Sequence, residues 1–290
     1  MLCPQARRLY DIVMFISFLL AFFAAFANAA SSLLQRKANM GKSRTVLLKR
    51  PVWLLGVGVA LVSFVLQAGA LSNGSLAAIE PVLALELVLV VLGSGIFFKT
   101  HIGKQEWVSV VLMTAGTAGL IAALNPQKKD FVVITARQWV VALGLSALVV
   151  GGCCLAAYLV RRREHQAALL GVGTGAALGL TSSLLKDAML VFKHGGIVSV
   201  LSSWELYAAL AVGIFTFWLL QVALRSGKLV ASQPGITLAD PFMAIGWGAW
   251  IFQEKMNTGV GLIFALVAAL ALGVGAVLLA RAPALEGHRT

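Results

Sequence analysis

The chain has 290 residues, of which 60% are hydrophobic and only 12% are charged, and its mean hydropathy is +0.92. Water-soluble domains carry about 25% charged residues, so this composition excludes them and predicts an all-α integral membrane protein whose main partner is the lipid bilayer. The net charge is +12. Because no aromatic residues interleave with the basic ones, we expect no nucleic-acid partner.

Nine apolar runs of about 20 residues, the length that crosses a bilayer, follow one another with short polar breaks between them. They cover residues 11–34, 51–71, 75–98, 107–125, 138–160, 167–191, 205–225, 229–252 and 259–280. The first run resembles a signal peptide, but its end recurs later in the chain, so we expect it to be retained.

Lysine and arginine are distributed unevenly among the breaks. With the N-terminus outside, 15 of them lie on the inner side and seven on the outer side. Basic loops stay in the cytoplasm, so the sequence predicts an N-out, C-in topology. The compact loops and the lack of a separate soluble region favour the cytoplasmic membrane of a bacterium.

The run 74–98 has a copy in 227–252. In each copy a proline follows a glycine by seven residues, a polar residue precedes the proline, and an acid follows it: Glu80, Pro81 and Glu86 in the first copy, and Gln233, Pro234 and Asp240 in the second. With Pro241, these prolines predict broken helices, and carboxylates within a span indicate a function or a partner.

Two further repeats have the same separation. Residues 31–36 (SSLLQR) recur as 182–187 (SSLLKD), and the ends of spans two and seven match at Gln67 and Gln221. All copies lie five spans apart, and an odd separation gives them opposite orientations. The sequence therefore predicts two inverted-topology repeats, 1–134 with about four helices and 135–290 with about five, which favours alternating access.

Polar residues within the spans are the candidates for substrate binding or coupling. Gln233, Thr237 and Asp240 share one helix face by their spacing of four and then three residues, as do Asn28, Ser32 and Gln35. Interhelical hydrogen bonding is the alternative use of such faces. Glu80 and Glu86 are six residues apart, about 120° around an unbroken helix, and form no paired site unless Pro81 distorts the turn.

Charge within the spans leaves several interpretations open. Lys186 could be neutralised by Asp187, Glu80 or another carboxylate, or could reach the outer surface. It could also be a counter-charge that moves during transport, or a contact for an anionic substrate. Glu86 and Asp240 together could bind magnesium, which prefers oxygen ligands, although the sequence does not show that they converge. A face formed by Gly171, Gly175 and Gly179 would suit internal helix packing or a homodimer.

The chain resembles the drug/metabolite transporter superfamily (EamA-like transporters), and within it the nine-span branch that contains the NIPA-type magnesium transporters. The resemblance covers nearly the whole chain and rests on Ser31–Gln35, on the small residues before Pro81 and Pro234, on Gln221 with Ala223-Leu224, and on Gly175–Gly179 leading to Lys186. Magnesium-transporting members tend to carry a small hydroxyl residue before the prolines, where this chain has Glu80 and Gln233.

Three functions remain open from the sequence. The first is a secondary transporter that moves a small polar solute or metabolite, the second is a divalent cation transporter chiefly for magnesium, and the third is a membrane scaffold or accessory subunit without transport. We expect no enzyme, because no nucleophile, base or metal-ligand constellation is visible. We also expect no cofactor apart from a coupling ion, either a proton or a divalent cation.

Overall fold

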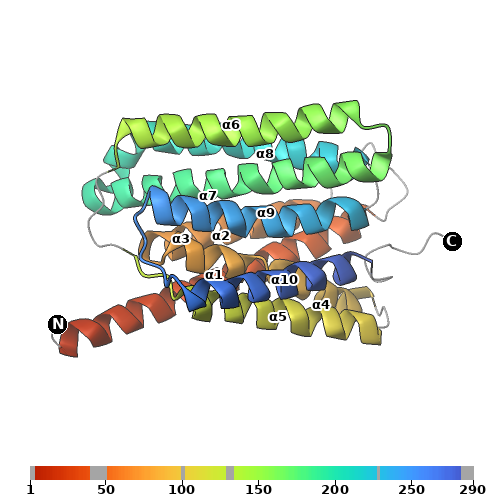
Figure 1. Ribbon diagram of the computed structural model, residues 1–290, viewed down its shortest axis with the longest axis horizontal. Helices are drawn as coiled ribbons and strands as arrows, with labels where there is room; N and C mark the ends of the chain where they lie inside the picture. The colour runs from red at the N-terminus through yellow and green to blue at the C-terminus, as the bar shows by residue number, and fades with distance from the viewer. Residues whose placement is uncertain (1–3, 40–50, 99–101, 129–133, 227–228, 282–290) are drawn as a thin grey trace.

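The computed structural model describes residues 4–39, 51–98, 102–128, 134–226 and 229–281, and these ranges form ten α-helices (Figure 1). The helices are α1 (Pro4–Asn39), α2 (Pro51–Asn73), α3 (Leu76–Leu83), α4 (Glu86–Phe98), α5 (Lys104–Leu124), α6 (Ala136–Leu159), α7 (Arg163–Leu201), α8 (Trp204–Ser226), α9 (Leu229–Trp250) and α10 (Val260–Ala280). Strands are absent from the described ranges apart from one isolated antiparallel bridge between Gln127 and Lys255. The predicted all-helical class is confirmed.

Eight stretches of the described chain are long and apolar enough to cross a membrane, and they coincide with eight of the nine predicted spans. Helices α3 and α4 together make one of these stretches, Leu76–Phe97. The ninth predicted span forms α9, which is 22 residues long but carries two prolines and several polar residues. The protein is therefore an all-helical integral membrane protein.

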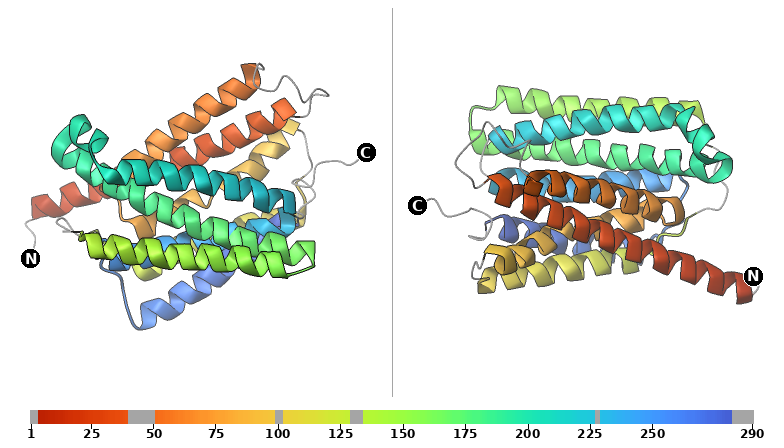
Figure 2. Two further views of the ribbon diagram at one scale, coloured as in Figure 1. Left: turned by 90° about the horizontal axis from the view of Figure 1, so that it is seen from above. Right: turned by 180° about the vertical axis from the view of Figure 1, so that it is seen from behind.

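Helix α7 lies in the interior of the bundle, where α6, α8 and α9 pack against it (Figures 1 and 2). Large apolar side chains of α1, α2, α6, α8 and α10 are exposed, as expected of helices that face lipid. A Cβ atom at Gly171, Gly175 or Gly179 of α7 would collide with α9. The glycine face is therefore used for helix packing within one chain, because small residues let membrane helices approach closely.

The two copied runs differ in their continuity. In the first run, α3 ends two residues after Pro81, and α4 begins at Glu86 after a short turn. In the second, α9 runs without interruption through Pro234 and Pro241, so the expected break is present only in the first copy. Neighbouring helices let membrane helices tolerate prolines, and α9 is held along its length by the glycine face of α7.

Helix α1 begins at one end of the bundle and α10 ends at the opposite end (Figure 1). We call the end where α1 begins the N-terminal end of the bundle and the other the C-terminal end. The N-terminal end holds the connections that join α2 to α3, α7 to α8 and α9 to α10. The C-terminal end holds the α6–α7 connection with Arg161 and Arg162, and the last described residue, Arg281.

Candidate substrate site

Lys186 of α7 is buried and pairs with Glu254, which follows α9. The Lys186 Nζ lies 2.5 Å from the Glu254 Oε1, and the two side chains are 5% and 0% exposed. The same Nζ donates a hydrogen bond of 3.1 Å to the Gly74 carbonyl. Among the partners that the sequence left open for Lys186, the structure selects another carboxylate, because Asp187 is directed elsewhere.

Glu254 also holds the beginning of α3. Its two carboxylate oxygens accept hydrogen bonds from the backbone N–H groups of Leu76 (2.6 Å) and Ala77 (3.1 Å). The first N–H groups of a helix lack partners within the helix and carry partial positive charge. Glu254 therefore satisfies one cation and two helix donors at once, and it ties α3, α7 and the end of α9 together.

The chain reaches this position through a tight turn after α9. The Glu254 N–H donates to the Gly248 carbonyl at 2.9 Å, and Gln253 has a positive φ of 49°. A Cβ atom at residue 248 would lie 2.6 Å from a Glu254 carboxylate oxygen, so glycine leaves the space that the carboxylate fills. The Phe252 ring lies against Lys186, with its centroid 4.8 Å from the Nζ.

Glu80 of α3 is buried next to this pair and is 1% exposed. The side chains of Ser182 and Gln67, from α7 and α2, make hydrogen-bonding contact with its carboxyl group, and Lys186 acts on it electrostatically. One carboxyl oxygen, Oε1, is buried without a hydrogen-bond partner. A buried polar atom without a partner costs free energy, so this oxygen is available to a ligand or a proton.

Glu86 begins α4 at the break that follows Pro81. The Asn28 Nδ2 donates to its Oε2 at 2.5 Å, and the Ser32 hydroxyl lies 3.4 Å from its Oε1. Two members of the predicted α1 face therefore reach Glu86. Gln35, the third member, instead donates to the Ser31 hydroxyl at 2.9 Å.

Asp240 of α9 also has a buried carboxyl oxygen, Oδ1, without a hydrogen-bond partner. Both Glu80 and Glu86 act on its carboxyl group electrostatically, so the structure brings the three acids into one region of the bundle. We call Glu80, Glu86 and Asp240 the central carboxylate cluster. The described residues contain no group of three acidic, histidine or cysteine side chains close enough to enclose a metal ion.

Other predicted site residues lie outside this cluster or have different contacts. The Thr237 hydroxyl donates to the Gln233 backbone carbonyl at 3.0 Å. Within the described part of the chain, no hydrogen bond links Gln233 or Gln221 to the three carboxylates, whereas Gln67 contacts both Glu80 and Ser182. Sequence reasoning did not single out Ser182 as a contact of Glu80, although its place in the repeated SSLL pattern could have indicated it.

The cluster can attract positive charge. It combines three carboxyl groups with neutral donors, and the basic side chain beside it, Lys186, is already paired with Glu254. Carboxylates that face the interior of a helix bundle mark ion or substrate pathways in membrane proteins. Magnesium is held through one or two carboxylates and keeps several waters, so a hydrated cation does not require three protein ligands at one point.

No protein-family model matches the chain, and neither does any solved structure. An uncharacterized protein of Corynebacterium glutamicum is 28% identical over 233 residues, which cover 78% of this chain and 80% of that protein. The probable magnesium transporter NIPA9 of Arabidopsis thaliana is 21% identical over 244 residues, which cover 81% of this chain and 71% of that protein. With the eight apolar helices, this distant similarity supports a membrane transporter.

Proposed function

We propose that the chain is a secondary transporter of the drug/metabolite transporter superfamily and that it moves a cation by way of the central carboxylate cluster. The observation that carries the proposal is the pair of buried carboxyl oxygens without partners, Glu80 Oε1 and Asp240 Oδ1. They come from the two copied runs, and a site between two repeats is the usual place for substrate in such transporters.

The two repeats are proposed to be residues 1–134 and 135–290. Their helices pack in matching ways: α1 lies against α2 as α7 lies against α8, and α3 with α4 lies against α1 as α9 lies against α7. Helices α5 and α10, the last of each series, pack against each other. Helix α6 has no counterpart in this scheme, and it packs on α7.

Alternating access requires that the cluster be open to one side of the membrane while it is closed to the other. At the N-terminal end of the bundle, the Lys186–Glu254 pair joins α7, α3 and the end of α9. We assign this pair the role of a gate, whose opening would let a cation reach Glu80. With the N-terminus outside, the gate faces outward, and a reporter fused after Thr290 should face the cytoplasm.

Magnesium is the first cargo to test, since the distant relative NIPA9 is a probable magnesium transporter. The experiment measures magnesium entry into proteoliposomes with an internal magnesium dye. We expect uptake by the wild type and at least a tenfold loss in Glu86→Gln and in Asp240→Asn, because each change removes a charge that would hold the cation. Glu164→Gln, at the exposed start of α7, removes an acid remote from the cluster and should transport normally.

A small polar metabolite with an amino group is the second candidate. The observation that favours it is the set of neutral side chains that contact the acids. Asn28 and Ser32 contact Glu86, and Gln67 and Ser182 contact Glu80. Such side chains could form hydrogen bonds with hydroxyl or amine groups of an organic solute. Folded wild-type protein without magnesium flux would direct the search to metabolites under an imposed proton gradient, and failure of both would favour a scaffold or accessory role.

A further inference from the structure

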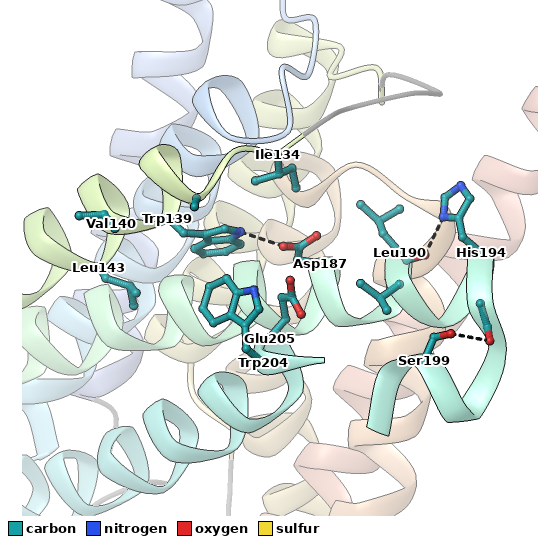
Figure 3. A pocket seen from close by; sticks show the side chains of 13 residues that line it. Ile134, Trp139, Val140, Leu143, Asp187, Leu190, His194, Ser199, Trp204 and Glu205 are labelled. Atoms are coloured by element: carbon teal, nitrogen blue, oxygen red, sulfur yellow. Dashed lines mark hydrogen bonds between the residues drawn. The ribbon is translucent and has the colours of Figure 1, made fainter. Parts of the chain in front are cut away.

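A cavity is lined by residues of α6, α7 and α8, and Figure 3 shows its side chains. It has a volume of about 730 Å³ and opens at the N-terminal end of the bundle, between the start of α6, the last part of α7 and the start of α8. Drug-sized ligands bind in cavities of roughly 300–1,000 Å³. Two adjacent residues of α7 have different surroundings: Lys186 pairs with Glu254, and Asp187 lines this cavity.

The backbone of α7 shapes the cavity. Gly196 has φ 72° and ψ −167°, values that interrupt the helix and that residues with a side chain rarely adopt. Gly195, just before this interruption, and Ser199, just after it, both line the cavity. The Ser199 hydroxyl donates to the Gly195 carbonyl at 2.8 Å and holds this turn.

Two tryptophans form an aromatic wall. The rings of Trp139 and Trp204 meet edge to face, with centroids 5.7 Å apart and an interplanar angle of 82°. The Trp139 Nε1 donates to the Asp187 Oδ2 at 2.8 Å, which fixes the orientation of the buried indole. Trp204 is 46% exposed, so part of its ring surface is available to a ligand.

The charge of the cavity is acidic. Asp187 and Glu205 both line it and act on one another electrostatically, and Figure 3 shows their carboxyl groups between the two tryptophans and Leu190. Among the described residues that line the cavity, none is a lysine or arginine, and His194 is bonded through its ring Nδ1 to the Leu190 carbonyl. Two carboxylates that share a cavity repel each other, and a cation between them relieves that repulsion.

We propose that this cavity binds an organic ammonium group, with the tryptophans against its carbon atoms and Asp187 and Glu205 opposite its charge. Aromatic side chains beside carboxylates recognise quaternary ammonium ions through cation–π attraction. A bare metal ion fits less well, since the walls of the cavity are largely apolar. The site is separate from the central carboxylate cluster and does not depend on the proposed cargo.

The test measures equilibrium binding of radiolabelled choline to the purified full-length protein. Its uncharged isostere, 3,3-dimethylbutan-1-ol, serves as the competitor that lacks only the charge. We expect saturable choline binding and at least tenfold weaker competition by the isostere. Glu205→Gln and Asp187→Asn should each weaken choline binding at least fivefold, and asparagine at 187 can still accept the Trp139 hydrogen bond, so the wall should stay in place.

A matched control tests whether the loss is specific to this site. Glu164→Gln removes an exposed acid at the other end of α7 and should leave choline binding unchanged. Equal loss in Glu164→Gln, or equal competition by the isostere, would overturn the proposal. So would choline binding that survives Glu205→Gln and Asp187→Asn together.

The ammonium group could belong to a free solute or to a lipid headgroup, and the membrane composition distinguishes the two. Choline binding is measured in nanodiscs of phosphatidylglycerol alone and in nanodiscs with phosphatidylethanolamine added. Competition by phosphatidylethanolamine that is lost in Glu205→Gln identifies a lipid headgroup as an occupant of the site. Unchanged choline binding in both membranes identifies a free solute.

Discussion

Helices α1 and α7 carry the same Ser-Ser-Leu-Leu pattern, yet they lie in very different surroundings. Within an apolar window of 18 residues, 72% of the residues of α7 are buried, whereas only 28% of those of α1 are. Helix α6 packs on α7, and no described helix packs on α1 in the same way. One sequence pattern therefore serves an interior helix and a lipid-facing helix.

The residues that follow the pattern show what this difference does. Lys186 of α7 and Gln35 of α1 occupy the same place in the repeat. Lys186 reaches another helix region and pairs with Glu254, while Gln35 bonds to Ser31 within its own helix. The interior copy therefore holds the bundle together at this position, and the peripheral copy makes a local contact.

The largest loss of stability should follow from Lys186→Met. The change leaves the Glu254 carboxylate buried without its counter-charge, and breaking a buried ion pair costs about 3–5 kcal/mol. Unfolding of the purified protein in detergent, followed by circular dichroism, measures the loss of stability. Gln35→Ala is the matched change in α1 and should cost less than about 1 kcal/mol. Equal losses at the two positions would contradict the comparison, and adding Glu254→Gln to Lys186→Met should restore part of the stability.

A smaller effect should follow from Gly175→Ala. The added Cβ would lie 2.6 Å from the Ile236 carbonyl oxygen of α9, so the two helices must separate. Overpacking of this kind costs about 1–3 kcal/mol. Gly151→Ala, where no atom lies within 4 Å of the new Cβ, is the control and should be neutral or slightly stabilising. The same unfolding measurement applies, and a Gly175→Ala variant as stable as the control would exclude close α7–α9 packing.

The smallest effect concerns the α1 contribution to the cluster. Asn28→Ala removes the 2.5 Å hydrogen bond to Glu86 and should weaken substrate binding about fivefold to tenfold, since such a bond contributes about 1 kcal/mol. Ser32→Ala removes a longer contact to Glu86, 3.4 Å, and should weaken substrate binding less. The KM for magnesium uptake in proteoliposomes measures both changes. A larger effect from Ser32→Ala would contradict the geometry at Glu86.

Local patterns predicted the helices, because helix formation depends on the sequence along one segment. They also placed Asn28 and Ser32 on one face of α1, but they did not predict that this face reaches Glu86. The partner of Lys186 could not be predicted in this way. Glu254 lies 68 residues further along the chain, and only the turn after α9 brings it back to α7. The different continuity of the copied runs was also hidden, since a proline ends one helix and is tolerated in the other according to what packs beside it.

The bridge between Gln127 and Lys255 has a mechanical consequence. Its two hydrogen bonds, 2.8 and 2.9 Å long, fasten the segment after α5 to the segment before α10 at the N-terminal end of the bundle. Helices α5 and α10 also pack against each other, so the bridge adds a backbone link between them at this end of the bundle. If the proposed gate opens while this bridge stays intact, the α7 side would have to move away from α5 and α10. The Lys186–Glu254 pair, which joins α7 to the residue next to the bridge, would then break.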